Sequence, residues 1–170
     1  IVLPDCPAPH FHHEAELAFT VGKTASKVRA EDASDFIFGY VNFIDVSARG
    51  LTPNGEESYF WAKSWDTFAP MGPALVTADE IRDPQNLAMR LWVDGDLRQD
   101  LSTSDMARSV GEVLEFVTLI MTLKPGDVVA TGTNHIGLGP IQDADTVDME
   151  IEGLGRLSVN VQDDWKRTWP

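Results

Sequence analysis

Two glutamates near the start of the chain are spaced so that both could bind one ion. Glu14 and Glu16 lie in residues 14–21, where apolar side chains alternate with other side chains, which is the pattern of a β-strand. Side chains two residues apart leave the same face of a strand, about 7 Å apart. Carboxylates converging there favour Mg²⁺, Mn²⁺ or Ca²⁺ over Zn²⁺. An exposed strand face with two solvated glutamates is the alternative, and periodicity alone leaves both open.

Three further polar residues gain meaning only in combination with these glutamates. Asp45 ends a β-rich segment, as turn residues often do, and Thr133 lies beside a glycine. Lys63 stands within an aromatic segment, residues 59–68. A lysine in such a setting is either a cation–π surface residue or a partly buried ammonium that requires an anion.

The segments that must position these residues are mostly short strands. Period-two patterns, β-branched runs and turn signals such as Asp94-Gly95 predict strands over residues 14–21, 40–46, 87–93, 97–101, 128–130, 147–151 and 157–161, with 128–130 buried. Many strands with few helices indicate an α+β domain dominated by β-sheet.

Few helices are expected. Apolar residues at three- and four-residue spacing predict one long helix over residues 104–122, capped by Ser104. Residues 30–38 are predicted as a short helix ending at Gly39, and residues 77–80 begin a short helix or turn. Residues 49–57 have the composition of a surface loop.

Length and charge narrow the class of protein. The chain has 170 residues, one cysteine and a formal net charge of −14. This length supports a single core without disulfides. The negative field repels phosphate backbones and anionic lipids, so nucleic acids and membrane surfaces are poor partners. Because no targeting signal or long apolar segment is visible, we expect a cytoplasmic protein.

The motifs, taken in order, resemble the fumarylacetoacetate hydrolase family, particularly its acylpyruvate hydrolase and decarboxylase-like branch. The similarity covers nearly the whole chain, and its agreement in order and spacing is highly specific. The motifs are His12-His13-Glu14-Ala15-Glu16-Leu17, Phe38-Gly39-Tyr40 with Asp45-Val46-Ser47-Ala48-Arg49, residues 62–73 (AKSWDTFAPMGP), Leu123-Lys124-Pro125-Gly126-Asp127 and Thr131-Gly132-Thr133.

The resemblance implies a metal centre. Glu14, Glu16 and Asp45 would hold one divalent cation, normally Mg²⁺, with Mn²⁺ or Ca²⁺ as substitutes. His13 would either orient the glutamates as a hydrogen-bond donor or serve only in packing.

The resemblance also implies a set of substrate contacts. Lys63 would stand beside the metal as a catalytic residue and contact the substrate enolate or carboxylate. Thr133 would donate a hydrogen bond to a substrate carboxylate, and Arg49 would bind substrate from a loop. The expected partner is a small anionic keto acid.

The implied fold and activity follow from the same resemblance. We expect one catalytic domain over residues 1–170, with a β-rich sandwich or roll, one long helix and short helices, assembled as a homodimer. The first expected activity is metal-dependent hydrolysis of a C–C bond in a 1,3-diketo or acylpyruvate-type 2-oxo acid. A decarboxylase or isomerase using the same site is the alternative, and a metal-binding protein without turnover is a remote one.

The chain also departs from the family pattern. A water-activating His/Glu pair normally lies on a helical lid upstream of the first motif, and this chain begins after that point. Either the protein continues upstream of the given chain, or the lid is disordered, or the base is lost and only decarboxylation or binding remains. Gly50 and Thr52 replace the usual Asp and Gln of the substrate loop, and Ala144 replaces a glycine. His135 follows Thr133 where the family usually has Pro-x-Gly, and would either reach the pocket or lie in a surface loop.

Overall fold

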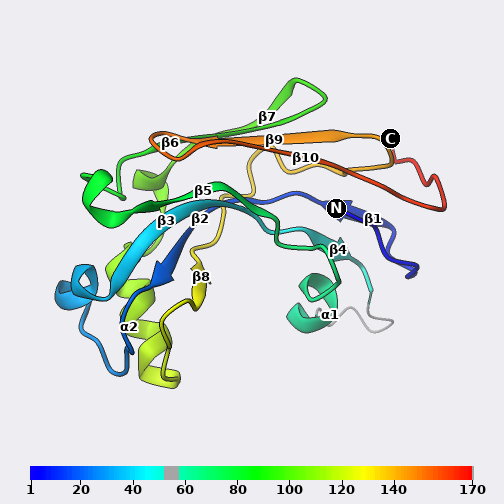
Figure 1. Cartoon of the computed structure of the whole chain (residues 1–170). Helices are drawn as coiled ribbons and strands as arrows, with labels where there is room; N and C mark the ends of the chain where they lie inside the picture. The colour runs from blue at the N-terminus through cyan, green and yellow to red at the C-terminus, as the bar shows by residue number, and fades with distance from the viewer. Residues whose placement is uncertain (52–57, 170) are drawn as a thin grey trace.

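Ten strands form three antiparallel sheets (Figure 1), in a computed structural model that describes residues 1–51 and 58–169. The first four-stranded sheet has the order β5-β3-β2-β8 and the second β10-β9-β6-β7, while β1 and β4 pair separately. The first sheet comprises β2 (Ala15–Val21), β3 (Ile37–Ile44), β5 (Met71–Thr77) and β8 (Val128–Ala130). The second comprises β6 (Ala88–Val93), β7 (Asp96–Ser102), β9 (Thr146–Ile151) and β10 (Gly155–Asn160). The small pair is β1 (His10–His12) and β4 (Ser47–Arg49).

The two larger sheets stack (Figure 1). Buried apolar side chains from both sheets form one core. Alternate residues of β2 enter this core, namely Leu17, Phe19 and Val21. The facing strands contribute in the same way, with Leu91 from β6 and Met149 from β9 completely buried. Two inward-facing sets of side chains at period two are what a β-sandwich requires. The predicted β-rich α+β class is confirmed, and the second sheet contains two antiparallel hairpins, β6–β7 and β9–β10.

The helices are short, and the two α-helices lie below the sheets in Figure 1. They are the α-helices α1 (Tyr59–Lys63) and α2 (Val110–Ile120) and the 3₁₀ helices η1 (Ala30–Asp35), η2 (Ala78–Glu80) and η3 (Thr103–Asp105). The long helix predicted over residues 104–122 therefore begins later than expected. Ser109 caps it, accepting from the Glu112 N–H while the Glu112 carboxylate accepts from the Ser109 N–H. This reciprocal capping box satisfies two backbone donors, whereas Ser104 caps no α-helix.

Two other predictions need correction. The helix predicted over residues 30–38 ends at Asp35, and β3 begins at Ile37. Gly39 lies within that strand, where a Cβ would stand 2.3 Å from the Val76 carbonyl oxygen, so this glycine serves a close approach of β3 and β5. Strand β8 forms, but Val128 is 37% exposed, so the strand is not buried as predicted. Of the predicted surface loop at residues 49–57, residues 52–57 lie outside the described part of the chain.

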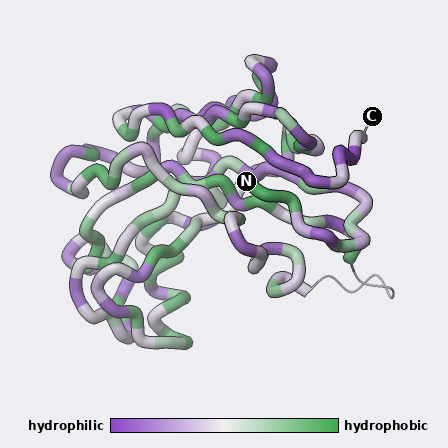
Figure 2. Tube along the Cα trace, turned by 45° about the vertical axis from the view of Figure 1, so that its right-hand side comes forward, coloured by the Kyte–Doolittle hydropathy of each residue, from purple (hydrophilic) through white to green (hydrophobic). Residues whose placement is uncertain are grey.

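Hydrophobic and hydrophilic residues are mixed along the whole length of the described chain (Figure 2). None of the helices in residues 1–51 and 58–169 has the length and apolar character needed to cross a membrane.

The two candidate helix caps can be tested against each other. Ser109→Ala removes the hydroxyl that accepts from Glu112 and should lower the free energy of unfolding by about 1 kcal/mol. Ser104→Ala, at an exposed position outside the helix, should change it by less than about 0.5 kcal/mol. Urea denaturation followed by circular dichroism measures both, and equal effects would contradict the assignment of the cap to Ser109.

Candidate metal centre

The pairing of β2 with β3 brings the three acidic residues together. Ala15 pairs with Ile44, so Glu14 and Asp45 are the next residues at the end of the same ladder. The Asp45 N–H donates to the Glu14 carbonyl at 2.9 Å and fixes this end. Glu16 is two residues from Glu14, so its side chain leaves the same face of β2. One carboxylate oxygen from each of Glu14, Glu16 and Asp45 lies within 4.8 Å of the other two.

Burial rules out the interpretation of an exposed glutamate face. Glu14 is 4% exposed and Glu16 is 3% exposed, and every residue of β2 is buried. A carboxylate removed from water requires hydrogen bonds, a cation or a proton, because desolvation disfavours the charged form. The neighbours of the three carboxylates show which of these each one receives.

Two cationic side chains reach Glu14 and Asp45. Lys63, the last residue of α1, donates from Nζ to Glu14 Oε2 at 3.0 Å, to Ser47 Oγ at 2.9 Å and to Asp45. Arg49, at the end of β4, donates to Glu14 Oε1. Of the two interpretations of Lys63, the partly buried ammonium that requires an anion is therefore correct. The neighbouring aromatic rings of Tyr59 and Phe60 are turned to the surface, 77% and 74% exposed.

Glu16 receives a backbone donor instead of a cationic side chain. The Gly132 N–H donates to Glu16 Oε2 at 2.8 Å, from the loop that follows β8. Thr131 anchors this loop on β2, because its N–H and its hydroxyl both donate to the Leu17 carbonyl. Gly132 has φ +89°, a conformation that glycine adopts without strain. The Thr131-Gly132-Thr133 motif thus places one amide against the third carboxylate.

The protonation preferences follow from these contacts. Burial, followed by the negative charge of Asp45, raises the pKa of Glu16 to about 7. Burial is the largest influence on Asp45 and, together with the negative charge of Glu14, raises its pKa although the Lys63 ammonium acts in the opposite direction. For Lys63, burial alone would lower the pKa, but the carboxylates of Asp45 and Glu14 outweigh it and raise the pKa. The site therefore carries more negative charge than its own cationic groups balance.

A hard divalent cation fits this donor set. Three carboxylates present oxygen ligands to one point, and oxygen-only ligation is typical of Mg²⁺, Mn²⁺ and Ca²⁺. Burial and the negative charge of Asp45 raise the pKa of Glu16, and the hydrogen bond that Glu16 receives comes from a neutral amide. A dication between the three groups would supply a counter-charge, and Glu14, Glu16 and Asp45 are the residues that would hold it.

The remaining candidates lie around this centre. Thr133 is partly buried, with its hydroxyl bonded to Gln99 Nε2 at 3.2 Å. His13 is completely buried, and its Nδ1 contacts Gln99 Oε1 at 3.3 Å, so its hydrogen bond goes to Gln99 instead of to a glutamate. Burial lowers the pKa of His13 to about 4 and keeps the ring neutral at pH 7. His135 is exposed, as the surface-loop interpretation expects.

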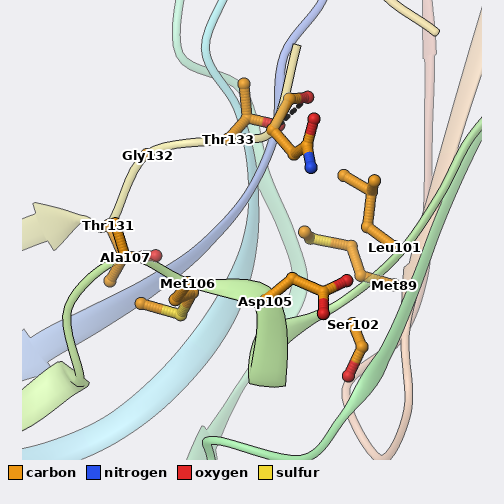
Figure 3. A pocket seen from close by; sticks show the side chains of 10 residues that line it. Met89, Leu101, Ser102, Asp105, Met106, Ala107, Thr131, Gly132 and Thr133 are labelled. Carbon is orange, nitrogen blue, oxygen red and sulfur yellow. Dashed lines mark hydrogen bonds between the residues drawn. The ribbon is translucent and has the colours of Figure 1, made fainter. Parts of the chain in front are cut away.

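A cavity of about 390 Å³ is lined in part by the Thr131-Gly132-Thr133 loop (Figure 3). Its wall is mainly apolar, with Met89 and Leu101 from β6 and β7 and Met106 from the segment before α2. The three carboxylates are not among its lining residues. The loop whose Gly132 amide contacts Glu16 therefore also lines this cavity, and Thr133 is one of its lining residues.

A family comparison agrees with this arrangement of fold and site. The model for the fumarylacetoacetate (FAA) hydrolase C-terminal domain matches residues 1–162. The chain belongs to the fumarylacetoacetate hydrolase family. The resemblance found in the ordered motifs is thereby confirmed.

Similar proteins have several named activities. A maleylpyruvate hydrolase of Aquipseudomonas alcaligenes is 40% identical over 88% of this chain and 50% of its own length. An oxaloacetate tautomerase of Bacillus subtilis is 40% identical over 86% of this chain and 50% of its own length. The crystal structure of a Sphingobium maleylpyruvate hydrolase with manganese(II) and pyruvate superposes with a TM-score of 0.88 at 40% identity, covering 96% of this chain and 58% of that one. The chain thus spans about half the length of these relatives.

Three contributors to the site were given no role from the sequence. Ser47 contacts Lys63 and is completely buried, Gly132 supplies the amide to Glu16, and Gln99 joins His13 to Thr133. Asp45, Ser47 and Arg49 are spaced two residues apart, so in an extended segment their side chains share one face. This spacing could have indicated that Ser47 lies beside the other two. Gln99 and Leu101 lie two residues apart on a predicted strand and therefore share a face, which suggests that the Gln99 amide points inward. The spacing does not identify the partners of that amide.

The raised pKa of Glu16 predicts how cation binding depends on pH. Below pH 7 most Glu16 is protonated, so Mn²⁺ must displace that proton, and its apparent affinity should fall by up to about tenfold per pH unit. Above pH 7 Glu16 is ionised, and its titration no longer contributes. Isothermal titration calorimetry in buffers of different ionisation enthalpy should show more proton release at pH 6 than at pH 8. An Mn²⁺ affinity that is the same at both values would contradict the assignment.

Proposed function

We propose that the protein is a divalent-metal-dependent hydrolase of 2-oxo acids, cleaving a C–C bond in a 1,3-diketo or acylpyruvate-type substrate. The observation that carries this proposal is the group of three carboxylates within 4.8 Å of one another, with both glutamates buried and Asp45 partly buried. The Lys63 ammonium lies against Glu14 and Asp45. Family membership and the relatives that act on maleylpyruvate support it. The manganese and pyruvate in the Sphingobium structure support both the kind of cation and the kind of ligand.

Glu14, Glu16 and Asp45 would hold the cation, Mg²⁺ or Mn²⁺, with Ca²⁺ as a further substitute. When bound, such a cation supplies Lewis-acid chemistry for a 2-oxo carboxylate. The formal charge of the three carboxylates, −3, would then be offset by the dication together with Lys63 and Arg49. The pocket would become able to accept an anion, although the chain as a whole is acidic.

The chain's own polar groups would orient the substrate and stabilise the charge that develops on it. Lys63 would keep its ammonium beside the enolate oxygen, where a fixed cation lowers the energy of the transition state. Arg49 would contact a substrate carboxylate from the end of β4, and Thr133 would donate its hydroxyl proton to another carboxylate oxygen. We assign His13 a packing and positioning role, because its ring stays neutral and its bond goes to Gln99.

The proposed reaction balances without an oxidant or reductant. Water adds to the distal acyl carbonyl, and the bond between that carbon and the neighbouring C3 breaks. The electron pair of the broken bond enters the enolate of the 2-oxo acid, and C3 then takes up a proton. The products are a carboxylic acid and a 2-oxo acid such as pyruvate.

A second candidate function forms the same kind of enolate but does not use water to cleave a C–C bond. Similarity to an oxaloacetate tautomerase favours a tautomerase, and a relative named as a bifunctional isomerase/decarboxylase adds isomerisation and loss of CO₂. In each of these reactions Lys63 would stabilise the same oxyanion. The expected homodimer stays a prediction.

Substrate trials should separate the candidates. The Mn²⁺-loaded protein should convert acetylpyruvate into acetate and pyruvate, followed by ¹³C NMR. With oxaloacetate, release of CO₂ would indicate a decarboxylase, and faster keto–enol exchange would indicate a tautomerase. EDTA should abolish turnover, and Mn²⁺ should restore it. Turnover at an undiminished rate after complete chelation would contradict the proposed role of the metal.

Removing the Lys63 ammonium tests its part in the reaction. Lys63→Met retains the aliphatic length and should lower kcat by about 100- to 1,000-fold, the usual effect of losing one group that stabilises an oxyanion. The matched control Lys23→Met, at an exposed position after β2, should leave kcat unchanged. Steady-state kinetics with the substrate identified in the trials provides the measurement. A Lys63→Met enzyme with the kcat of the control would exclude Lys63 from catalysis.

A further inference from the structure

We propose that Gln99 is a positioning residue for the substrate site, holding the hydroxyl of Thr133 so that its proton is available to a bound carboxylate. The proposal rests on the proposed function, because it assumes that Thr133 contacts an anionic substrate. It gives a role to a side chain that comes from the second sheet, on β7, while Glu16 lies on β2 of the first sheet and Glu14 and Asp45 lie directly beside the ends of β2 and β3.

Gln99 makes contacts in two directions. Its side chain is completely buried. The amide oxygen accepts from the Ala15 N–H at 3.0 Å and lies 3.3 Å from His13 Nδ1. The amide nitrogen donates to Thr133 Oγ1 at 3.2 Å and to the Asn134 carbonyl at 2.9 Å. One side chain therefore joins the strand segment that carries both glutamates to the loop that carries Thr133.

The chemistry of the partners fixes the orientation of this amide. A backbone N–H can only donate, so the atom facing Ala15 must be the oxygen. A backbone carbonyl can only accept, so the atom facing Asn134 must be the nitrogen. These two partners leave no freedom to exchange the oxygen and nitrogen of Gln99. The 3.3 Å contact to His13 is then a hydrogen bond only when Nδ1 carries the proton.

This orientation determines what the hydroxyl of Thr133 can do. A hydroxyl has one proton and two acceptor sites. Because Gln99 donates to Thr133 Oγ1, the hydroxyl uses one acceptor site there and retains its own proton. Within residues 1–51 and 58–169, that proton has one long contact, 3.3 Å, to the Asn134 carbonyl. A carboxylate is a stronger acceptor than a neutral carbonyl, so a bound keto acid would capture it.

A second contact holds the same loop against β7. Gly137 has φ +80°, and a Cβ at this position would stand 1.8 Å from the carbonyl oxygen of Arg98, the residue before Gln99. The backbone of the loop thus packs directly on β7 beside the Gln99 amide. Two neighbouring residues of β7 therefore position this loop: Gln99 through its side-chain amide and Arg98 through its backbone carbonyl.

The test measures binding of pyruvate to the Mn²⁺-loaded protein, and binding of Mn²⁺ alone, by calorimetry. Gln99→Met keeps the length of the side chain and removes all four polar contacts. It should weaken pyruvate binding about tenfold, the effect of one misplaced charge-assisted hydrogen bond. Mn²⁺ affinity without pyruvate should change by less than about threefold, because Gln99 does not touch the three carboxylates.

A double-mutant cycle separates positioning from general stability. Thr133→Val should weaken pyruvate binding about tenfold in the wild-type background but less than about twofold in the Gln99→Met background, since both changes remove the same contact. The control is Gln85→Leu, which removes another glutamine that bridges backbone segments, at Thr103 and Val110. It should lower thermal stability and leave pyruvate affinity unchanged. Gln99→Glu, of equal size and with an acceptor for Ala15, replaces the Met variant where that variant does not fold.

The outcomes are distinct. If the wild-type protein binds Mn²⁺ but not pyruvate, the proposed function fails, and this inference fails with it. If the wild type binds both, and the Gln99 variants bind pyruvate with wild-type affinity, only the inference is overturned. A full tenfold effect of Thr133→Val in the Gln99→Met background would also overturn it, because Thr133 would then act independently of Gln99.

Discussion

Mutual repulsion among three carboxylates largely removed from water is the constraint on which the rest of the site depends. Glu14, Glu16 and Asp45 converge within 4.8 Å, with both glutamates buried and Asp45 partly buried, so solvent screens their charges poorly. The chain offsets part of this repulsion by bringing Lys63 from a helix and Arg49 from a two-stranded sheet. Within the described residues the hydrogen-bond donor to Glu16 is the amide of Gly132 and not a cationic side chain, so the unbalanced charge is concentrated where a divalent cation would complete the set.

Local patterns predicted much of the fold. Alternation identified β2, and Asp94-Gly95 identified the β6–β7 hairpin, because both signals depend on neighbouring residues. The start of α2 was wrong, since Ser104 and Ser109 both precede the same apolar run and only Ser109 has a glutamate three residues later that bonds back. Gly39 was taken for a helix end because a glycine required by a neighbouring strand resembles one required by a turn.

The spacing of the two glutamates could be read from the sequence, but the environment of the three carboxylates could not. Periodicity placed Glu14 and Glu16 on one face, yet it contains no information about what covers that face. The decision between solvated and buried carboxylates depends on Lys63, which is 49 residues away from Glu14 along the chain. Gln99 lies still further away, and its four contacts arise only when the second sheet packs on the first. Contacts between sheets leave no periodic signal in a single sequence.

The register in which β2 pairs with β3 determines both the packing of the core and the position of the candidate metal ligands. A slip of one residue would turn Leu17, Phe19 and Val21 out of the core and would at the same time separate Glu14 from Asp45. Misfolded molecules therefore cannot accumulate as well-packed copies with a defective site, since the same error exposes apolar surface to proteases and chaperones. For β2 and β3, quality control of folding also acts as quality control of the active centre.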